Sequence, residues 1–292
     1  MVNRKEGFIH VSGGRIFYVT FGDINSTAAP LIVVHGGPGF SHDTLEITAP
    51  LARDRFLILY DQLGCGRSDR PTDKTLWSLR RYASELDAIV SYFHLDRYHL
   101  LGHSFGGSVV LEHSLTHPQG LMSIILSSPL VSVKDWLADT ATRKKELPQT
   151  VQSIIDHHEV SGTTDSDDYK KAVSEFNRRF LCRLLPRPDS YQNAFKRFNN
   201  DIYQQMWGPS EFHCTGSLAS YNRANDLDKI NVPACLLCGD QDEVRETTIK
   251  KYAEKLQARY HILPNSTHST YLEATTTFMA RVDQFLQQVE SN

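Results

Sequence analysis

The sequence predicts an α/β fold in which a mostly parallel, eight-stranded sheet is interrupted by an inserted helical cap. Short apolar runs alternate with longer segments of helical periodicity, as they do when parallel strands are joined by right-handed crossovers. The alternation stops near residue 132 and resumes near residue 228, and the interval is charged, aromatic and without a clear strand. We therefore expect a core of residues 1–131 and 228–292 and a cap of residues 132–227.

Eight runs have the character of strands. Residues 8–11 and 15–19 are joined by Ser12-Gly13-Gly14, which predicts a hairpin. Continuous apolar runs, typical of strands covered on both faces, span residues 31–34, 56–60, 98–101, 123–127, 234–238 and 260–263. Helices are expected over residues 76–93, 108–118, 246–256 and 276–289. Ligands bind beyond the carboxyl ends of parallel strands, where the glycine-rich turns of this chain lie.

Ten aromatic residues recur through the expected cap. We expect most of them to form the cap's own core and a few to line a pocket. They are Trp136, Tyr169, Phe176, Phe180, Tyr191, Phe195, Phe198, Tyr203, Trp207 and Phe212. Residues 163–168 and the tripeptide Pro186-Arg187-Pro188 are typical of breaks between helices.

The composition excludes several classes of function. A net charge of −3 over 292 residues gives no electrostatic reason to bind nucleic acid or an anionic membrane. No apolar run approaches the roughly 18–20 residues that span a bilayer, and residues 1–7 lack the apolar region of a signal peptide, so we expect a cytoplasmic protein. We expect no metal and no cofactor, and the oligomeric state is left open.

Cys235 and Cys238 form a C-x-x-C within an apolar run, where small core residues are a better interpretation than a zinc or redox site.

The segment Gly102-His103-Ser104-Phe105-Gly106 has the pattern G-x-S-x-G between a predicted strand and a predicted helix. A serine at such a sharp turn lifts its hydroxyl out of the sheet, and the flanking glycines avoid collisions with neighbouring backbone. Ser104 is therefore the candidate nucleophile.

A serine hydroxyl is a weak nucleophile that needs a general base, and the base needs an orienting acid. Asp242 and His268 both follow predicted strands, and the order Ser104, Asp242, His268 is the one expected for a hydrolase of this sheet type. Asp240 is the rival for the acid, and Asp242 is favoured. His35 and His103 are interpreted as structural.

An oxyanion requires hydrogen-bond donors. We expect one amide from Phe105 and one from Gly37, in the turn His35-Gly36-Gly37-Pro38-Gly39. That turn is an unlikely phosphate loop, because it lacks the Lys-Ser/Thr ending of a P-loop.

Together, the motifs resemble those of the proline iminopeptidases of the α/β-hydrolase superfamily. The resemblance covers about residues 8–285 and rests on residues 35–39, 61–68, 102–107, 207–216 and 238–243. The cap motif Gly208-Pro209-Ser210-Glu211-Phe212 is the most discriminating of them, because generic hydrolases have no reason to carry it.

The resemblance implies a serine aminopeptidase that releases an N-terminal residue, preferably proline, from small peptides or aminoacyl amides with a free N-terminus. It also implies that Glu211 and Glu243 bind the substrate's α-ammonium, since an ammonium desolvated in a pocket needs a paired carboxylate. From the residues alone, solvated or salt-bridged surface groups are the better interpretation of these two glutamates. The alternatives are an amino-acid amidase, an esterase or a lactonase on the same scaffold, and a non-catalytic ligand receptor.

Overall fold

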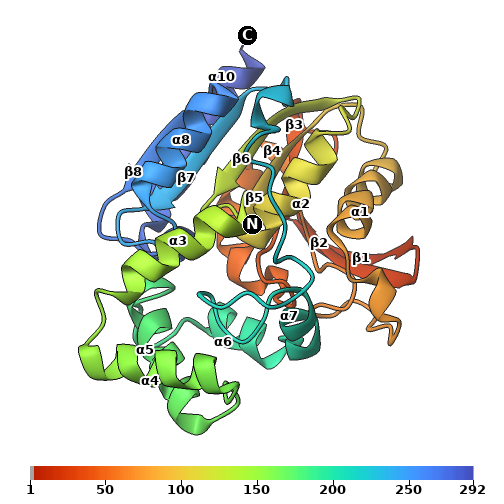
Figure 1. Ribbon diagram of the computed structural model, residues 1–292. Coiled ribbons are helices and arrows are strands. Elements are labelled where there is room, and N and C mark those ends of the chain that lie inside the picture. The colour runs from red at the N-terminus through yellow and green to blue at the C-terminus, as the bar shows by residue number, and fades with distance from the viewer. Residues whose placement is uncertain (1–2, 292) are drawn as a thin grey trace.

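The computed structural model describes residues 3–291, which form an eight-stranded sheet flanked by helices (Figure 1). Residues 1, 2 and 292 lie outside the described residues. They are the outermost positions of the expected core segments, and residues 1 and 2 also belong to the N-terminal stretch analysed above. The strands are β1 (Arg4–Val11), β2 (Gly14–Phe21), β3 (Ala28–Val34), β4 (Arg55–Tyr60), β5 (Tyr98–His103), β6 (Leu121–Ser127), β7 (Ala234–Gly239) and β8 (Arg259–Leu263). All eight were predicted from the sequence.

The strands lie in the order β1-β2-β4-β3-β5-β6-β7-β8. The β1–β2 and β2–β4 pairs are antiparallel, and every pair from β4 onward through β8 is parallel. The parallel strands therefore end at one edge of the sheet, and this edge carries the turns that the sequence singled out. The predicted fold class is confirmed.

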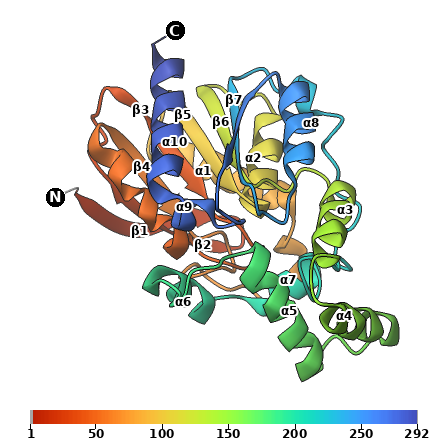
Figure 2. The same ribbon diagram turned by 90° about the vertical axis from the view of Figure 1, so that its left-hand side faces the viewer.

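Both faces of the sheet are buried. Side chains alternate between the two faces along each strand, so each face contributes to a core of its own. In β3, Ile32 and Val34 pack into one apolar cluster, while Leu31 and Val33 pack into another on the opposite face. Helices α1 (Leu79–Tyr92), α2 (Phe105–Ser114) and α8 (Glu246–Leu256) cover the first face, and α10 (Thr275–Glu290) covers the second (Figure 2).

Short elements complete the core. The 3₁₀ segment η1 (His42–Arg53) and helix α9 (Thr270–Glu273) lie on the α10 side of the sheet. They were not predicted, because Pro50 interrupts the periodicity of the first and the second is only a single turn. The remaining short segments are η2 (Lys74–Leu76) and η3 (Leu227–Lys229).

Five helices lie between β6 and β7 and pack beside the carboxyl edge of the sheet (Figures 1 and 2). They are α3 (Val133–Lys144), α4 (Gln149–Ser161), α5 (Asp167–Phe180), α6 (Asp189–Lys196) and α7 (Asn200–Met206). The last twenty residues before η3, 207–226, contain no helix, whereas the sequence suggested helical character throughout. Gly208, Pro209 and Gly216 account for the difference, since glycine and proline disfavour helix interiors.

The aromatic residues of this segment are more dispersed than predicted. A separate apolar cluster, away from the sheet, contains Tyr169, Phe176, Phe180 and Phe212. In contrast, Trp136, Tyr203 and Trp207 belong to the cluster on the sheet. The expectation that most of them form the cap's own core was therefore wrong, because the segment lies against the sheet edge and shares its core.

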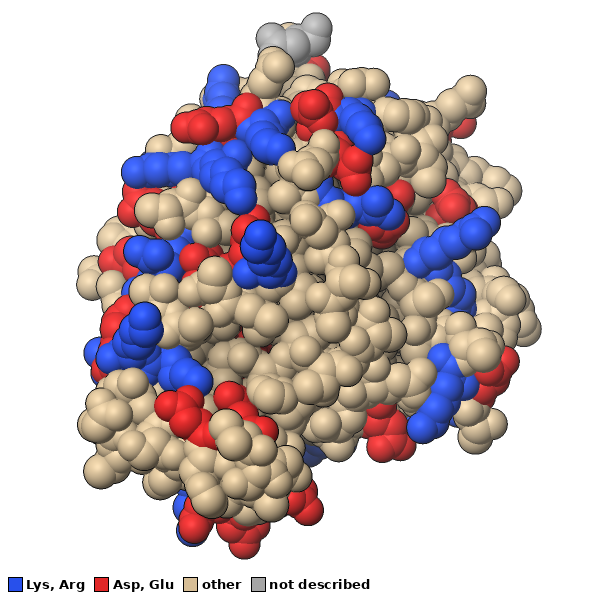
Figure 3. All heavy atoms as spheres, in the orientation of Figure 1, with Lys and Arg blue, Asp and Glu red and all other residues tan. Residues whose placement is uncertain are grey.

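The face drawn in Figure 3 shows no broad region of a single charge. On this face, lysine and arginine side chains alternate with aspartate and glutamate. Within residues 3–291, no helix combines the length and apolar character needed to cross a membrane. Cys235 and Cys238 are buried in β7, as their apolar surroundings predicted.

Candidate active site

Ser104 occupies a strained turn between β5 and α2. Its backbone has φ 55° and ψ −123°, a conformation that non-glycine residues adopt only under constraint. The Ser104 amide donates to the Ser127 carbonyl at 2.9 Å, which ties the turn to β6. The flanking glycines are required: a Cβ on Gly102 would lie 2.5 Å from the Gly106 carbonyl oxygen, and one on Gly106 would lie 2.3 Å from that of Val34.

His268 and Asp242 meet although they follow different strands. His268 Nδ1 donates to Asp242 Oδ1 at 2.9 Å, and both side chains are buried. Burial raises the pKa of Asp242, but the charge and hydrogen bond of His268 outweigh it and leave that pKa below its ordinary value. Asp242 is therefore ionised and can fix the tautomer of the imidazole.

Ser128 is part of this arrangement and was missed by the sequence analysis. Its hydroxyl donates to Asp242 Oδ2 at 2.5 Å, and the Val244 amide donates to Oδ1 at 3.1 Å. The only local signal was the position of Ser128 directly after a predicted strand.

Asp240, the rival acid, has a different role. Its carboxylate accepts a hydrogen bond from the Ser266 amide at 3.2 Å and so connects the turn after β7 to the loop after β8. Among the described residues it makes no contact with His268, so the imidazole lies against Asp242 instead.

The turn after β3 lies against Ser104. A Cβ placed on Gly36 would be 3.0 Å from the Ser104 Cβ. Gly37 has φ +128°, and a side chain there would meet the Gly39 and Phe40 amides at 2.8 and 2.9 Å. Gly37 thus permits a turn that faces the serine.

The amide of Phe105, the other expected donor, directly follows the same serine. Phe105 is the first residue of α2, so its N–H precedes the hydrogen-bonded ladder of the helix and carries the positive end of its dipole. Gly37 and Ser104 line one cavity. The amides of Gly37 and Phe105 thus remain the predicted oxyanion donors.

His35 and His103, interpreted above as structural, are both buried. His35 Nε2 accepts from the Gln62 amide at 3.0 Å, and the His103 ring packs 4.7 Å from that of His268, centroid to centroid. Burial lowers the pKa of both His35 and His103, so they remain neutral.

Glu243 is a buried carboxylate without a donor. Neither oxygen forms a hydrogen bond within the described residues. Oε1 lies 3.5 Å from His268 Nδ1, whose proton goes to Asp242 instead. Burial raises the pKa of Glu243 well above its ordinary value, and the charges of Glu211 and Asp242 add to the effect.

Glu211 is the second carboxylate of this region. It accepts a hydrogen bond from the Tyr203 hydroxyl at 2.7 Å, and its backbone carbonyl accepts from the Trp136 indole at 3.0 Å. Burial raises the pKa of Glu211, against the opposing effects of Tyr203 and His268. Within residues 3–291, no lysine or arginine pairs with Glu211 or Glu243, so the two carboxylates lack a cation.

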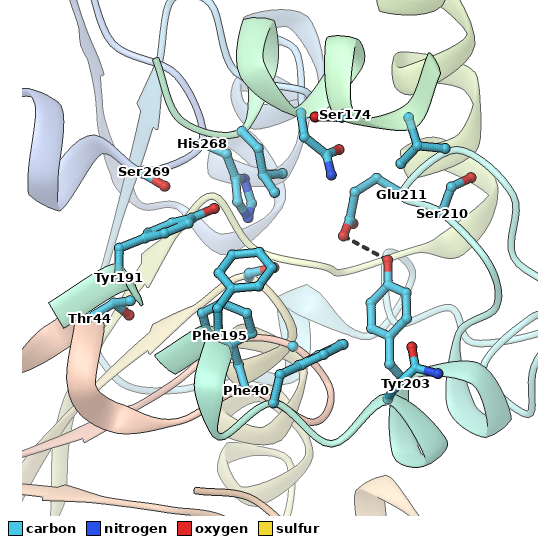
Figure 4. Close-up of a pocket in the computed structure, with 18 of the residues that line it drawn as sticks. Phe40, Thr44, Ser174, Tyr191, Phe195, Tyr203, Ser210, Glu211, His268 and Ser269 are labelled. Carbon is cyan, nitrogen blue, oxygen red and sulfur yellow. Dashed lines mark hydrogen bonds between the residues drawn. The ribbon is translucent and has the colours of Figure 1, made fainter. Parts of the chain in front are cut away.

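A cavity of about 1030 Å³ joins these groups. Glu211 and Tyr203 lie on one side, Tyr191 lies on the other, and His268 is between them (Figure 4). Aromatic side chains from both parts of the chain complete the wall: Phe40, Tyr169, Phe195 and Phe198. Glu243 does not line the cavity itself but lies buried beside His268.

Comparison with known proteins agrees with this architecture. The family described as "alpha/beta hydrolase fold" matches residues 29–275. A proline iminopeptidase of Heyndrickxia coagulans is 40% identical over 97% of this chain and 99% of its own length.

Solved structures extend the match to three dimensions. The proline iminopeptidase of Mycobacterium smegmatis superposes with a TM-score of 0.90 at 31% identity, over 98% of both chains. VinJ superposes with a TM-score of 0.93 at 32% identity, over 98% of this chain and 99% of its own. The chain is a hydrolase and belongs to the proline iminopeptidase family of the α/β-hydrolase fold.

Proposed function

We propose that the chain is a serine aminopeptidase that releases an N-terminal residue, preferably proline, from small peptides or aminoacyl amides. The observation that carries the proposal is the pair of carboxylates Glu211 and Glu243, which share a buried region without a cation. A substrate ammonium would supply the missing charge and the missing donors. The relatives named proline iminopeptidase support the choice of proline.

In the proposed mechanism, His268 takes the proton from Ser104 as the hydroxyl attacks the carbonyl of the N-terminal residue. Asp242 holds the imidazole and stabilises the imidazolium. The amides of Gly37 and Phe105 stabilise the tetrahedral oxyanion. His268 then returns the proton to the leaving amine, and water hydrolyses the acyl-enzyme by the same route.

The proposed division of the chain assigns residues 132–227 to a cap and residues 1–131 and 228–292 to the core. Glu211 comes from the cap segment, whereas Glu243 follows β7. The amine site is thus built from both parts, and the catalytic groups come from the core. A cytoplasmic location and the use of no metal or cofactor remain part of the proposal.

Replacement of either glutamate tests the function. Glu211→Gln and Glu243→Gln should each reduce kcat/KM for prolyl p-nitroanilide about 100-fold, since a buried ammonium would lose a charged partner. Hydrolysis of p-nitrophenyl acetate, which has no ammonium, should fall far less. The control is Glu254→Gln, an exposed residue of α8. Equal losses on both substrates would instead support a simple esterase.

A further inference from the structure

The cavity has a cationic side chain that the proposed mechanism does not use. Arg187 lies between Pro186 and Pro188, directly before α6, and lines the cavity. Its guanidinium carbon is 4.7 Å from the ring centroid of Tyr191. Stacking of this kind holds a guanidinium in one orientation while leaving its N–H groups free to bind.

Arg187 lacks an anionic partner. Its Nη1 is buried, and within residues 3–291 this nitrogen has no hydrogen-bond acceptor and the guanidinium has no ion pair. By contrast, Arg55 and Arg223 are paired: Arg55 Nη1 lies 3.0 Å from Glu290, and Arg223 Nε lies 2.6 Å from Glu112. A buried donor without an acceptor is costly, and the planar guanidinium fits a carboxylate in particular. The wall beside Tyr191 is therefore suited to an anionic group of a ligand.

The position of Arg187 shows where an anionic group would lie relative to the other groups of the substrate. Tyr191, on which Arg187 stacks, lies on one side of His268, and Glu211 lies on the other (Figure 4). The cavity is thus negative at one end and positive at the other, with the candidate catalytic groups between. A short peptide has the same order of groups: ammonium, scissile carbonyl and carboxylate.

We propose that Arg187 binds a carboxylate of the leaving portion of the substrate, so that the enzyme prefers short peptides with a free carboxylate over neutral amides. This inference rests on the proposed function, which places the ammonium at Glu211 and Glu243. Lys170 and Lys196 also line the cavity, but both are exposed. Exposed ammonium groups contribute little to binding, so Arg187 is assigned the main role.

The test compares three substrates that share an N-terminal proline: prolylalanine, prolylalaninamide and prolylglutamic acid α-amide, whose side-chain carboxylate is free. The native enzyme should cleave prolylalanine with a kcat/KM about tenfold or more above that of prolylalaninamide. Arg187→Gln should reduce this ratio to about one, and Arg187→Lys should restore part of it. Arg178→Gln, at an exposed arginine of α5, should keep the native ratio.

The third substrate identifies the origin of the carboxylate. In this substrate the C-terminus is an amide and the carboxylate is on the glutamate side chain. The site is supported if its kcat/KM also exceeds that of prolylalaninamide and if this difference disappears in Arg187→Gln. Melting temperatures of the variants show that each is folded.

Two results would overturn the inference. One is a native enzyme that cleaves the acids and the amide equally well; the other is a preference that disappears in Lys170→Gln or Lys196→Gln but survives in Arg187→Gln. Hydrolysis of prolyl p-nitroanilide is measured alongside. If that substrate is cleaved, the proposed function stands even when this inference fails, and if it is not cleaved, the proposed function itself fails.

Discussion

At the scale of single residues, Glu243 is proposed to bind the substrate but destabilises the folded protein when no substrate is bound. Its carboxyl is fully buried, receives no hydrogen bond within the described residues, and lies near the charges of Glu211 and Asp242. Groups that are poorly satisfied in the free protein are typical of sites whose partner is a ligand. Ser104, with its unusual backbone conformation, is a second residue of this kind.

Glu243→Gln should therefore stabilise the free protein in a pH-dependent way. The pKa of Glu243 is raised in the folded state, so the folded state keeps a proton that the unfolded state loses. Stability of the native protein then falls as pH rises above the ordinary carboxyl pKa. Glutamine does not titrate, so the variant should gain about 2 °C or more in Tm near pH 8 and almost nothing near pH 4.

Thermal unfolding followed by circular dichroism between pH 4 and pH 8 measures this gain. Glu254→Gln, at an exposed position of α8, is the matched control and should follow the native protein at each pH. A Glu243→Gln variant that is no more stable than the native protein at pH 8 would contradict the destabilising effect assigned to Glu243.

At the scale of elements, α3 and the turn after β7 depend on each other. Arg143, near the end of α3, donates from Nε to the Asp242 carbonyl at 2.7 Å and from Nη2 to the Asp240 carbonyl at 3.0 Å. The same guanidinium lies over the Phe180 ring at 5.5 Å. One side chain thus joins two cap helices to the turn that carries the acid, and the turn's geometry depends on it.

Arg143→Met should lower the free energy of unfolding by about 2 kcal/mol, because two backbone carbonyls lose charged donors. It should also reduce kcat on prolyl p-nitroanilide by loosening the turn that positions Asp242. Urea unfolding and steady-state kinetics measure the two effects. Arg178→Met is the control, since Arg178 is exposed and pairs with Glu175 on its own helix. An Arg143→Met variant with native stability would show that the turn holds its shape unaided.

At the scale of the whole molecule, the strands were predictable because each is an apolar run bounded by turn residues, and their order follows from parallel crossovers. The placement of Ser104, Asp242 and His268 at one edge of the sheet was predictable for the same reason, since strand ends meet there. The aromatic wall was not, because Phe40 precedes β4 while Tyr191 and Phe198 belong to the cap segment. No local pattern shows that such distant positions meet.

The properties of the carboxylates also escaped prediction. The sequence left Glu211 and Glu243 as either surface groups or ligands, and only the fold shows one fully buried and the other bonded to Tyr203. Burial of this kind depends on packing between segments that are far apart in the chain. Likewise, Ser128 contacts Asp242 across 114 positions of sequence.

The most direct measurement compares prolyl p-nitroanilide with its N-acetyl derivative, which has no ammonium but keeps the scissile bond. The native enzyme should lose about 100-fold or more in kcat/KM on acetylation. Ser104→Ala, expected to reduce turnover by roughly 10⁶, provides the blank. Equal cleavage of both substrates would contradict the central claim that buried carboxylates select a free N-terminus beside Ser104.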